Sequence, residues 1–299
     1  MMQLIDGLKI SRAIKAEIAE VVKELQAQNK RVPHLAAILV GNNIASATYV
    51  NGKIKSCKEV GFQSTLIQLP DTITEHELIS EIHLLNNNDA IDGFIVQLPL
   101  PKHIDEKDVI NNILPSKDVD GFHPVNVGKM VLDLPGFLPA TPKGILELLK
   151  RYHIETDGKN VVVVGRSNIV GMPVNIMLSK KAYPGNATVT LCHSATVNLK
   201  SYTLEADIII AATGKINLIT ADMVKDGVVI IDVGMNKLED ASKKRGYRLV
   251  GDVDFENVSK KASYITPVPG GVGLMTVASL LQNTLEAYKG TYYDKLIGL

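Results

Sequence analysis

Apolar residues in this chain fall into short uninterrupted runs and into longer segments with helical spacing, and the two kinds alternate. The run at residues 161–164 is four valines without alternation, which predicts a strand buried on both faces of a parallel sheet. Gly165 follows this run, and Gly171-Met172-Pro173 opens a further apolar run at 174–178 with helical spacing. A strand, a glycine-bounded loop and a helix start predict a phosphate-binding site, because backbone N–H groups and the helix dipole converge there.

Three more apolar runs in the second half of the chain each end at small or polar residues. They predict strands at residues 187–192, 207–212 and 228–233, followed by His193-Ser194, Thr213-Gly214 and Gly234. This repeated order predicts an α/β fold with a Rossmann-like doubly wound parallel sheet. The ligand edge of such a sheet is expected at the carboxyl ends of its strands.

The first half of the chain also alternates strands with helices, so we predict two α/β domains. Predicted strands occupy residues 35–40, 65–69 and 91–98. Predicted helices occupy residues 11–28, 46–60 and 74–85. We expect Gly61 to cap the second of these helices, and a Thr74-x-x-Glu77 capping box to open the third.

A Pro-Ala-Thr-Pro sequence at residues 139–142 marks the predicted domain boundary. Thr141 as N-cap and Pro142 at the first helical position predict a helix that runs to about Tyr152. We therefore predict a first domain at residues 1–139 and a nucleotide-binding domain at 140–274. A final helix at 276–287, within a C-terminal segment 275–299, is expected to pack back on the first domain.

Charge and composition exclude several classes of function. The chain has 299 residues with 32 basic and 32 acidic side chains, so no net field favours nucleic acid or an anionic membrane. It has no apolar run of about 18 residues, and its start lacks the pattern of a signal peptide. The two cysteines, Cys57 and Cys192, have no metal-ligand spacing, so we expect free thiols, a cytoplasmic location and no bound metal.

The loop after residues 161–164 carries Arg166 and Ser167 and lacks the G-x-G-x-x-G fingerprint. A guanidinium fork beside a hydroxyl suits a phosphate better than it suits a ribose hydroxyl. After the next predicted strand no carboxylate occurs until Glu205, although a site for NAD usually places Asp or Glu there. The pattern predicts a dinucleotide with a 2′-phosphate, while an ordinary turn with a solvated Arg166 stays open as an interpretation.

Three groups of polar residues in the first half are candidates for chemistry. Tyr49 and Lys53 are four residues apart on a predicted helix and therefore share a face, and Gln97 lies near the end of a predicted strand. Asp118 and Asp120 lie on a polar loop, where binding groups often reside. From spacing alone, a solvated helix face and an ordinary Asp-Gly turn stay open as interpretations.

A set of ordered segments resembles the bifunctional methylenetetrahydrofolate dehydrogenase/methenyltetrahydrofolate cyclohydrolase family over essentially the whole chain. The segments are Ala-Ser-Ala-Thr-Tyr-Val-Asn-Gly-Lys-Ile-Lys at 45–55, Val-Gln-Leu-Pro-Leu-Pro at 96–101, Lys-Asp-Val-Asp-Gly-Phe-His-Pro at 117–124, Val-Gly-Arg-Ser-Asn-Ile-Val-Gly-Met-Pro at 164–173, Cys-His-Ser at 192–194, Gly-Asp-Val at 251–253 and Pro-Val-Pro-Gly-Gly-Val-Gly at 267–273.

The resemblance implies NADP as cofactor and one-carbon derivatives of tetrahydrofolate as substrates, bound in a cleft between the two domains. Lys53 would be the catalytic base or proton shuttle, Gln97 would position it, and Tyr49 would orient the pterin. Asp120 would bind the aminopyrimidine edge of the pterin. Further substrate-binding residues are expected at Leu98, Pro269, Gly270 and Gly273. Cofactor-binding residues are expected at Gly165, Arg166, Ser167, Ile169, Val170, Gly171, His193, Ser194, Thr213, Gly214, Val233 and Gly234.

The implied activity is oxidation of methylenetetrahydrofolate to methenyltetrahydrofolate, followed by hydrolysis to 10-formyltetrahydrofolate at the same site. The resemblance also implies a homodimer and a place in one-carbon metabolism and purine biosynthesis. Ile44, Ala140 and Leu274 stand where Pro, Cys and Pro are common in the family, and none of them is assigned to chemistry. Two alternatives are an NADP-dependent hydroxy-acid dehydrogenase that uses a Lys/Asp pair, and a non-catalytic nucleotide-binding protein.

Overall fold

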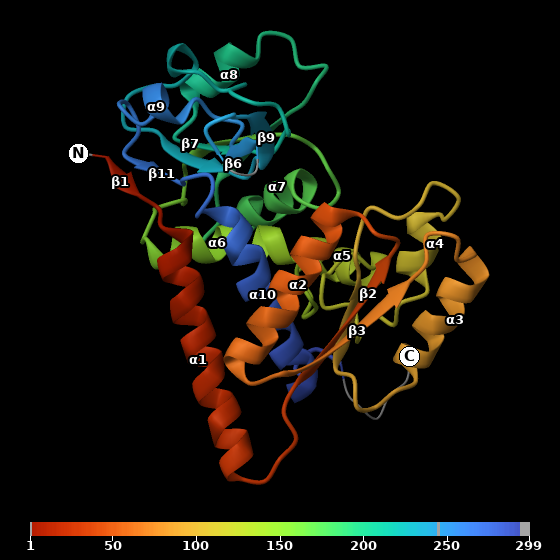
Figure 1. Ribbon diagram of the computed structural model, residues 1–299. Coiled ribbons are helices and arrows are strands. Elements are labelled where there is room, and N and C mark those ends of the chain that lie inside the picture. The colour runs from red at the N-terminus through yellow and green to blue at the C-terminus, as the bar shows by residue number, and fades with distance from the viewer. Residues whose placement is uncertain (1, 244–245, 294–299) are drawn as a thin grey trace. The chain divides into compact units, whose positions relative to one another are not determined.

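The computed structural model describes residues 2–243 and 246–293, and it divides the chain into two compact units (Figure 1). Unit 1 comprises Met1–Ser11 and Thr141–Thr276, and unit 2 comprises Arg12–Ala140 and Val277–Leu299. We assigned the first eleven residues to the first domain from the sequence, whereas their contacts place them with the second half of the chain. Residue 1 and the last part of the predicted C-terminal segment, 294–299, lie outside the described residues.

Unit 1 is built on a six-stranded sheet in the order β1-β11-β8-β7-β5-β6, and every neighbouring pair in it is parallel. Its strands are β1 (Gln3–Leu4), β5 (Asn160–Val164), β6 (Thr188–Cys192), β7 (Ile208–Ala211), β8 (Val229–Asp232) and β11 (Tyr264–Ile265). The prediction of a doubly wound parallel sheet is confirmed. The strand order reverses at β5, which has β6 on one side and β7 on the other, so the ligand crevice is expected at the carboxyl end of β5.

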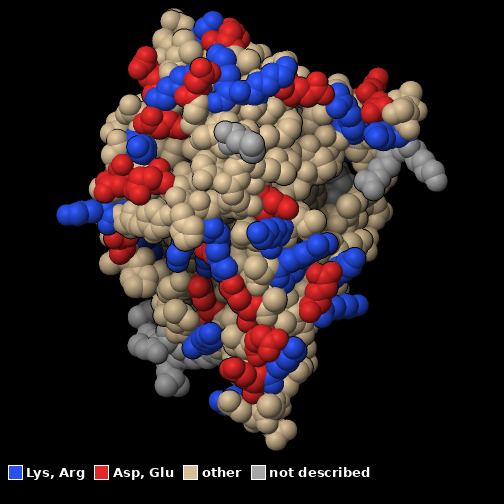
Figure 2. Space-filling view, turned by 90° about the vertical axis from the view of Figure 1, so that its left-hand side faces the viewer, with Lys and Arg blue, Asp and Glu red and all other residues tan. Residues whose placement is uncertain are grey.

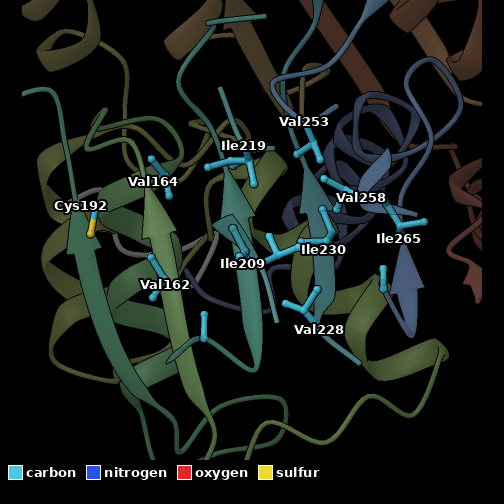
Figure 3. Packing of buried hydrophobic residues seen from close by; sticks show 14 residues of the cluster. Val162, Val164, Cys192, Ile209, Ile219, Val228, Ile230, Val253, Val258 and Ile265 are labelled. Atoms are coloured by element: carbon cyan, nitrogen blue, oxygen red, sulfur yellow. The ribbon is translucent and has the colours of Figure 1, made fainter. Parts of the chain in front are cut away.

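The central strands β5, β7 and β8 are covered on both faces, as their uninterrupted apolar runs predicted. Val162 and Val164 of β5, Ile209 of β7 and Ile230 of β8 pack into one cluster of buried residues (Figure 3). The other residues of β7 and β8 are buried as well. Burial on both faces explains why the sequence shows no alternation of apolar and polar residues in these strands.

The remaining elements of unit 1 are helices and one small hairpin. They are α6 (Ala140–Arg151), α7 (Gly171–Ser179), α8 (Leu199–Glu205), the 3₁₀ helix η1 (Ala221–Met223), α9 (Phe255–Val258) and an antiparallel hairpin of β9 (Asn236–Glu239) and β10 (Tyr247–Val250). The prediction that Thr141 is an N-cap is wrong, because α6 already begins at Ala140. The Thr141 hydroxyl instead shares a 2.8 Å hydrogen bond with that of Thr276.

Unit 2 is built on a three-stranded parallel sheet in the order β3-β2-β4. Its strands are β2 (His34–Val40), β3 (Gln63–Leu69) and β4 (Gly93–Val96). Its helices are α2 (Ile44–Val60), α3 (Glu75–Asn86), α4 (Glu106–Asn111), α5 (Pro124–Val131) and the greater part of α1 (Gly7–Ala27) and of α10 (Val272–Lys289). The capping box of Thr74 and Glu77 is confirmed at the start of α3.

The C-terminal helix α10 packs on the first half of the chain, which confirms that prediction. The side-chain amide of Asn283 donates to the carbonyl oxygens of Val119 at 2.8 Å and Leu138 at 2.9 Å. The helix begins at Val272, four residues before the predicted start.

Among the described residues, no helix has the length and the apolar character needed to cross a membrane. On the face that Figure 2 shows, basic and acidic side chains lie interspersed. Basic and acidic side chains therefore balance one another locally on this face, as they do over the whole sequence.

Candidate functional site

Lys53 and Gln97 meet at the carboxyl end of the small sheet. Lys53 lies on α2, and its Nζ donates a 3.2 Å hydrogen bond to Oε1 of Gln97, which directly follows β4. The amide of Gln97 is held from its other end, because Nε2 donates to the Leu98 carbonyl at 2.7 Å. Only 8% of Lys53 is exposed. A buried amine is thus held in one place, and among the described residues it has one acceptor for its three donor positions.

Tyr49 lies one turn before Lys53 on α2 and is 46% exposed. Residues four apart on a helix lie on the same face, so the phenol and the amine face the same side of α2. Partial burial raises the pKa of Tyr49, which keeps the phenol in its neutral form. The face therefore offers an aromatic ring next to an amine.

Asp120 lies on a loop that its neighbour Asp118 organises. The buried Asp118 carboxylate accepts backbone N–H groups from Gly121 at 3.1 Å, Phe122 at 3.2 Å and His123 at 2.8 Å. It also accepts the side-chain amide of Asn126 at 2.9 Å. Burial raises the pKa of Asp118, and these hydrogen bonds act in the opposite direction.

This network leaves the Asp120 carboxylate available to a ligand. Asp120 is half-buried, and none of the described residues donates a hydrogen bond to its carboxylate. Gly121 has φ of +75°, and a Cβ there would lie 2.6 Å from the carbonyl carbon of Leu138, so only glycine fits. Asn126 was missed from the sequence, because a single buried amide on a short helix gives no pattern.

In unit 1, the loop between β5 and α7 folds tightly over the end of β7. Gly165 has φ of +117°, and a Cβ there would lie 2.1 Å from the Ala212 carbonyl oxygen. A Cβ on Gly171 would lie 1.9 Å from the carbonyl oxygen of Gly165. Both glycines therefore allow backbone to approach backbone at the point where the strand order reverses, which is the geometry that a dinucleotide pyrophosphate needs.

Ser167 shapes this loop from within. Its hydroxyl oxygen accepts the Val170 N–H at 3.2 Å, and its carbonyl oxygen accepts the Met172 N–H at 3.0 Å. Within the described part of the chain, the hydroxyl proton of Ser167 has no acceptor. Arg166 is exposed and forms no ion pair with any residue that the structure describes. No side chain caps the start of α7, so a guanidinium, a hydroxyl and a helix N-terminus are left for an anion. Ile169, in the same loop, is exposed.

The turn after β6 holds the next two candidates for cofactor binding. The His193 N–H donates to the Thr196 hydroxyl at 2.8 Å, and the Ala195 N–H donates to Nδ1 of His193 at 3.2 Å. Ser194 lies between them and is exposed. The turn therefore holds Ser194 at the carboxyl end of β6, the strand that pairs with β5.

The turns after β7 and β8 are held by two buried carboxylates that we did not single out from the sequence. The N–H groups of Thr213 and Gly214 donate to Asp252, and the N–H of Gly234 donates to Asp232. Val233 donates its N–H to the Ala211 carbonyl. The N–H groups of these four candidates therefore already have acceptors within the protein. The four residues can contact a cofactor through the shape of their loops, and not through these N–H groups. An aspartate within the apolar run 228–233 was the signal that could have found Asp232.

The loop of residues 267–273, predicted to bind substrate through Pro269, Gly270 and Gly273, rests on the start of α1. The Leu8 N–H donates to the Gly270 carbonyl at 3.1 Å. A Cβ on Gly7 would lie 2.1 Å from the carbonyl oxygen of Gly271. Gly7 was also missed from the sequence, because the loop it contacts lies more than two hundred residues away in the chain.

The three departures from the family pattern differ in their surroundings. Ile44 is exposed at the start of α2, and Ala140 is buried at the start of α6. Leu274 is on the first turn of α10 and is 37% exposed. None of the three is a polar group that could carry a proton or hold a phosphate.

Comparison with protein families decides between the alternatives. Residues 5–120 match the catalytic domain of tetrahydrofolate dehydrogenase/cyclohydrolase, and residues 139–292 match its NAD(P)-binding domain. The chain belongs to the tetrahydrofolate dehydrogenase/cyclohydrolase family. Members of this family are similar to it over nearly their whole length. The bifunctional protein FolD of Flavobacterium johnsoniae is 60% identical over 288 residues, which cover 96% of this chain and 98% of that protein.

Solved structures of family members have the same fold. The bifunctional enzyme FolD of Campylobacter jejuni is 50% identical, with a TM-score of 0.91 and coverage of 97% of this chain and 100% of that one. The dehydrogenase-cyclohydrolase of Trypanosoma brucei, solved with NADP cofactor and an inhibitor, is 40% identical, with a TM-score of 0.92 and coverage of 97% and 98%. That the candidate residues of unit 1 and unit 2 serve one site stays a prediction.

Proposed function

We propose that this protein oxidises methylenetetrahydrofolate to methenyltetrahydrofolate with NADP and then hydrolyses the product to 10-formyltetrahydrofolate. The observation that carries the proposal is the buried Lys53 amine on the Gln97 amide, at 3.2 Å, in a member of this family. We further propose that residues 140–274 bind the cofactor and that residues 1–139, with 275–299, bind the folate.

The residues of unit 2 bind and orient the folate in both reactions. Asp120 offers a carboxylate with no described donor, which suits the paired N–H groups of an aminopyrimidine. The Tyr49 ring flanks the pterin on the same face of α2 as Lys53. Leu98 adds to these contacts, and the 267–273 loop of unit 1 stays a predicted substrate contact. Hydride transfer depends on close placement of two carbons more than on acid–base groups, so these residues act mainly by positioning.

Hydrolysis requires a group that moves protons, and Lys53 supplies it. Water adds to the methenyl carbon, and Lys53 relays the proton that the attacking water loses. The same side chain returns a proton to the ring nitrogen that leaves as the C–N bond breaks, while the hydroxyl of the adduct releases its proton to solvent and becomes the formyl carbonyl. Gln97 keeps the amine at the place where this transfer occurs, because its own amide is held by the Leu98 carbonyl.

The residues at the strand ends of unit 1 fit NADP. When bound, this cofactor accepts the hydride that leaves the methylene carbon. The tight turn of Gly165 and Gly171 admits a pyrophosphate, and Ile169 and Val170 complete the loop. Arg166, Ser167 and Ser194 offer one guanidinium and two hydroxyls to a 2′-phosphate. Thr213, Gly214, Val233 and Gly234 form the opposite edge of the crevice, and His193 shapes the turn that carries Ser194.

The wider setting follows from the same family. We propose a homodimer, a cytoplasmic location, and a place in one-carbon metabolism, where a formyl product can serve purine biosynthesis. Cys57 and Cys192 are both buried free thiols, which suits a reducing compartment. The hydroxy-acid dehydrogenase is not favoured, because both family models concern tetrahydrofolate enzymes.

The deciding experiment is an assay of the purified chain with methylenetetrahydrofolate and NADP. Formation of NADPH and of the methenyl product should depend on the folate, and added methenyltetrahydrofolate should decay faster than it does without enzyme. Reduction of NADP by simple hydroxy acids, with no turnover of folate, would contradict the proposal and restore the alternative.

A further inference from the structure

Asp252 is fully buried and binds the loop that follows β7. One of its carboxylate oxygens, Oδ2, accepts the N–H of Thr213 at 2.5 Å, the Thr213 hydroxyl at 2.9 Å and the N–H of Gly214 at 3.0 Å. The other oxygen, Oδ1, accepts the side-chain amide of Asn236 at 2.9 Å. Three hydrogen bonds to Oδ2 therefore fix the conformation of the Thr213–Gly214 turn, and the fourth, from Asn236, fixes the carboxylate itself.

A second buried carboxylate holds the segment that carries Asp252. Oδ1 of Asp232, the last residue of β8, accepts the N–H groups of Gly234 at 2.9 Å and Asp252 at 3.0 Å. Its Oδ2 accepts the N–H of Val253 at 3.0 Å. The two aspartates form a relay, in which β8 holds the 252–253 turn and this turn holds the end of β7.

The relay is closely packed. A Cβ on Gly234 would lie 2.2 Å from Oδ1 of Asp252, and a Cβ on Gly251 would lie 1.8 Å from Oδ2 of Asp232. Both glycines bring backbone against a carboxylate, so no larger side chain fits at either position. Close packing against these two glycines leaves the carboxylate oxygens little room to find other partners if one hydrogen bond is lost.

The relay ends at the predicted cofactor crevice. In the parallel pair of β5 and β7, Val164 lies beside Ala211, and the Ala212 N–H donates to the Val164 carbonyl at 2.8 Å. The glycine loop that begins at Gly165 rests directly on the Ala212 carbonyl. Thr213 and Gly214 therefore lie on the same surface as the predicted pyrophosphate loop.

We propose that Asp252, held by Asp232, is a positioning residue for NADP, which acts by fixing the Thr213–Gly214 edge of the cofactor crevice. The inference rests on the proposed function, since it assigns a role to residues that support the cofactor site. Asp252 donates nothing to the cofactor itself. It keeps the loop in the conformation that the bound dinucleotide requires, so its loss should act on cofactor binding and not on folate hydrolysis.

The first variant is Asp252→Asn. In either orientation its amide nitrogen faces a donor, which is the amide of Asn236 or the N–H groups of the 213–214 turn. The dissociation constant for NADP, measured by calorimetry, should rise roughly 10-fold or more. Cyclohydrolase activity, measured without NADP, should change less than about twofold, because Lys53, Gln97 and Asp120 belong to unit 2. The exposed Asp226→Asn, in the same unit, is the matched control and should leave both quantities unchanged.

A reciprocal variant tests the direction of the hydrogen bond. In the double variant Asp252→Asn/Asn236→Asp, the new carboxylate can accept the new amide, and the remaining oxygen of residue 252 can still accept the turn. NADP affinity should recover in part. If Asp252→Asn does not fold, Asn236→Ala removes one donor only and should weaken NADP binding by a smaller factor, roughly 2- to 5-fold.

The outcomes separate this inference from the proposed function. A wild-type protein that binds no NADP would contradict the proposed function. A wild type that binds NADP, with unchanged affinity in Asp252→Asn or, should that variant not fold, in Asn236→Ala, would overturn the positioning role alone. An equal loss of cofactor binding and NADP-free cyclohydrolase activity would also overturn it, because the relay would then support the fold as a whole.

Discussion

At the scale of the residue, the candidate chemistry rests on side chains whose partners are fixed before any ligand binds. Lys53 is held by Gln97, whose own amide is held by the Leu98 carbonyl. Asp120 is left without a described donor because its neighbour Asp118 takes the N–H groups of the loop. In each case one polar group positions the site and another is available to bind or react with a ligand. A site preorganised in this way lowers the barrier to reaction.

Replacement of Lys53 by Ala should abolish cyclohydrolase activity and leave measurable dehydrogenase activity. Water addition needs a proton acceptor, whereas departure of a hydride does not. General-base catalysis contributes roughly 10²- to 10⁴-fold, so the loss should be plain in an assay of methenyl decay. Lys55→Ala, an exposed lysine on the same helix, is the control. Hydrolysis that stays at the wild-type rate in the Lys53 variant would remove this residue from its role.

Replacement of Arg166 by Ala should weaken NADP binding and leave NAD binding nearly unchanged. Arg166 forms no ion pair with the described part of the chain, so its guanidinium is available for the 2′-phosphate that only NADP carries. Loss of one charge-assisted contact corresponds to about 1.5–3 kcal/mol, or roughly 10- to 150-fold.

The measurement is kcat/KM for both cofactors, with Arg248→Ala in the same unit as control. Equal losses for NADP and NAD would show that Arg166 supports the loop or the shared pyrophosphate instead.

At the scale of the element, the sequence was sufficient wherever a run of apolar residues was long enough to mark burial. Strands β5, β7 and β8 are valine- and isoleucine-rich and buried on both faces, so their runs predicted a parallel sheet. Strands β1 and β11 were not predicted, because each has only two residues. The hairpin of β9 and β10 was missed because no residue of either strand is buried, so its sequence shows no long apolar run.

The prediction of a Thr141 N-cap failed for a different reason, since local sequence does not show tertiary competition. The Thr141 hydroxyl bonds to Thr276, a residue 135 positions away, and α6 begins one residue earlier than the N-cap pattern requires. Gly7, Asp232 and Asp252 were missed on the same ground. Gly7 and Asp252 contact segments remote in sequence, and neither has a repeated spacing that would give a signal. Asp232 did give one, as an aspartate within an apolar run, but its partner Asp252 lies 20 residues away.

The contact between α1 and the loop 267–273 gives a prediction at this scale. In Gly7→Ala the added methyl would lie 2.1 Å from the Gly271 carbonyl oxygen, so the helix start or the loop must shift. If the loop binds folate, KM for folate should rise several-fold in both reactions, on the order of 1 kcal/mol or more. Affinity for NADP should change less.

Steady-state kinetics with folate as the varied substrate measures the effect. Gly128→Ala is the matched control, because a Cβ at that position in α5 meets nothing within 4 Å. A Gly7 variant with unchanged KM in both reactions would show that the loop does not contact the folate.

At the scale of the whole molecule, stability reflects opposing titrations. The pKa of Asp207 lies below its usual range because Lys225 donates to it, so this carboxylate stabilises the fold above its unfolded pKa and loses that contribution as pH falls. Asp118 and Asp232 are buried, and burial raises the pKa of each, so they act with the opposite sign. Equal numbers of acidic and basic residues keep general repulsion small near neutral pH, which leaves such individual groups visible.

The raised pKa of Asp232 predicts how the stability of the fold depends on pH. Burial raises its pKa from 3.8 to about 6, against the effect of three backbone N–H donors, and the carboxylate that faces it is that of Asp252. A raised carboxyl pKa means that the folded state binds the proton more tightly, so the stabilisation is complete below about pH 4 and is lost as pH rises through about 6. The difference corresponds to about 3 kcal/mol at 1.36 kcal/mol for each pH unit.

The variant Asp232→Asn lacks this titration. Relative to the variant, wild type should therefore lose about 3 kcal/mol of unfolding free energy between about pH 4 and pH 7, measured by denaturant unfolding at each pH. The exposed Asp226→Asn should follow wild type throughout. A constant difference between wild type and Asp232→Asn at all pH values would contradict the raised pKa. If this loss is observed, the ionised, buried Asp232 carboxylate lowers the stability of the fold at neutral pH. A destabilising buried group of this kind is expected where it is retained for a function, which here is to hold the cofactor loops in place.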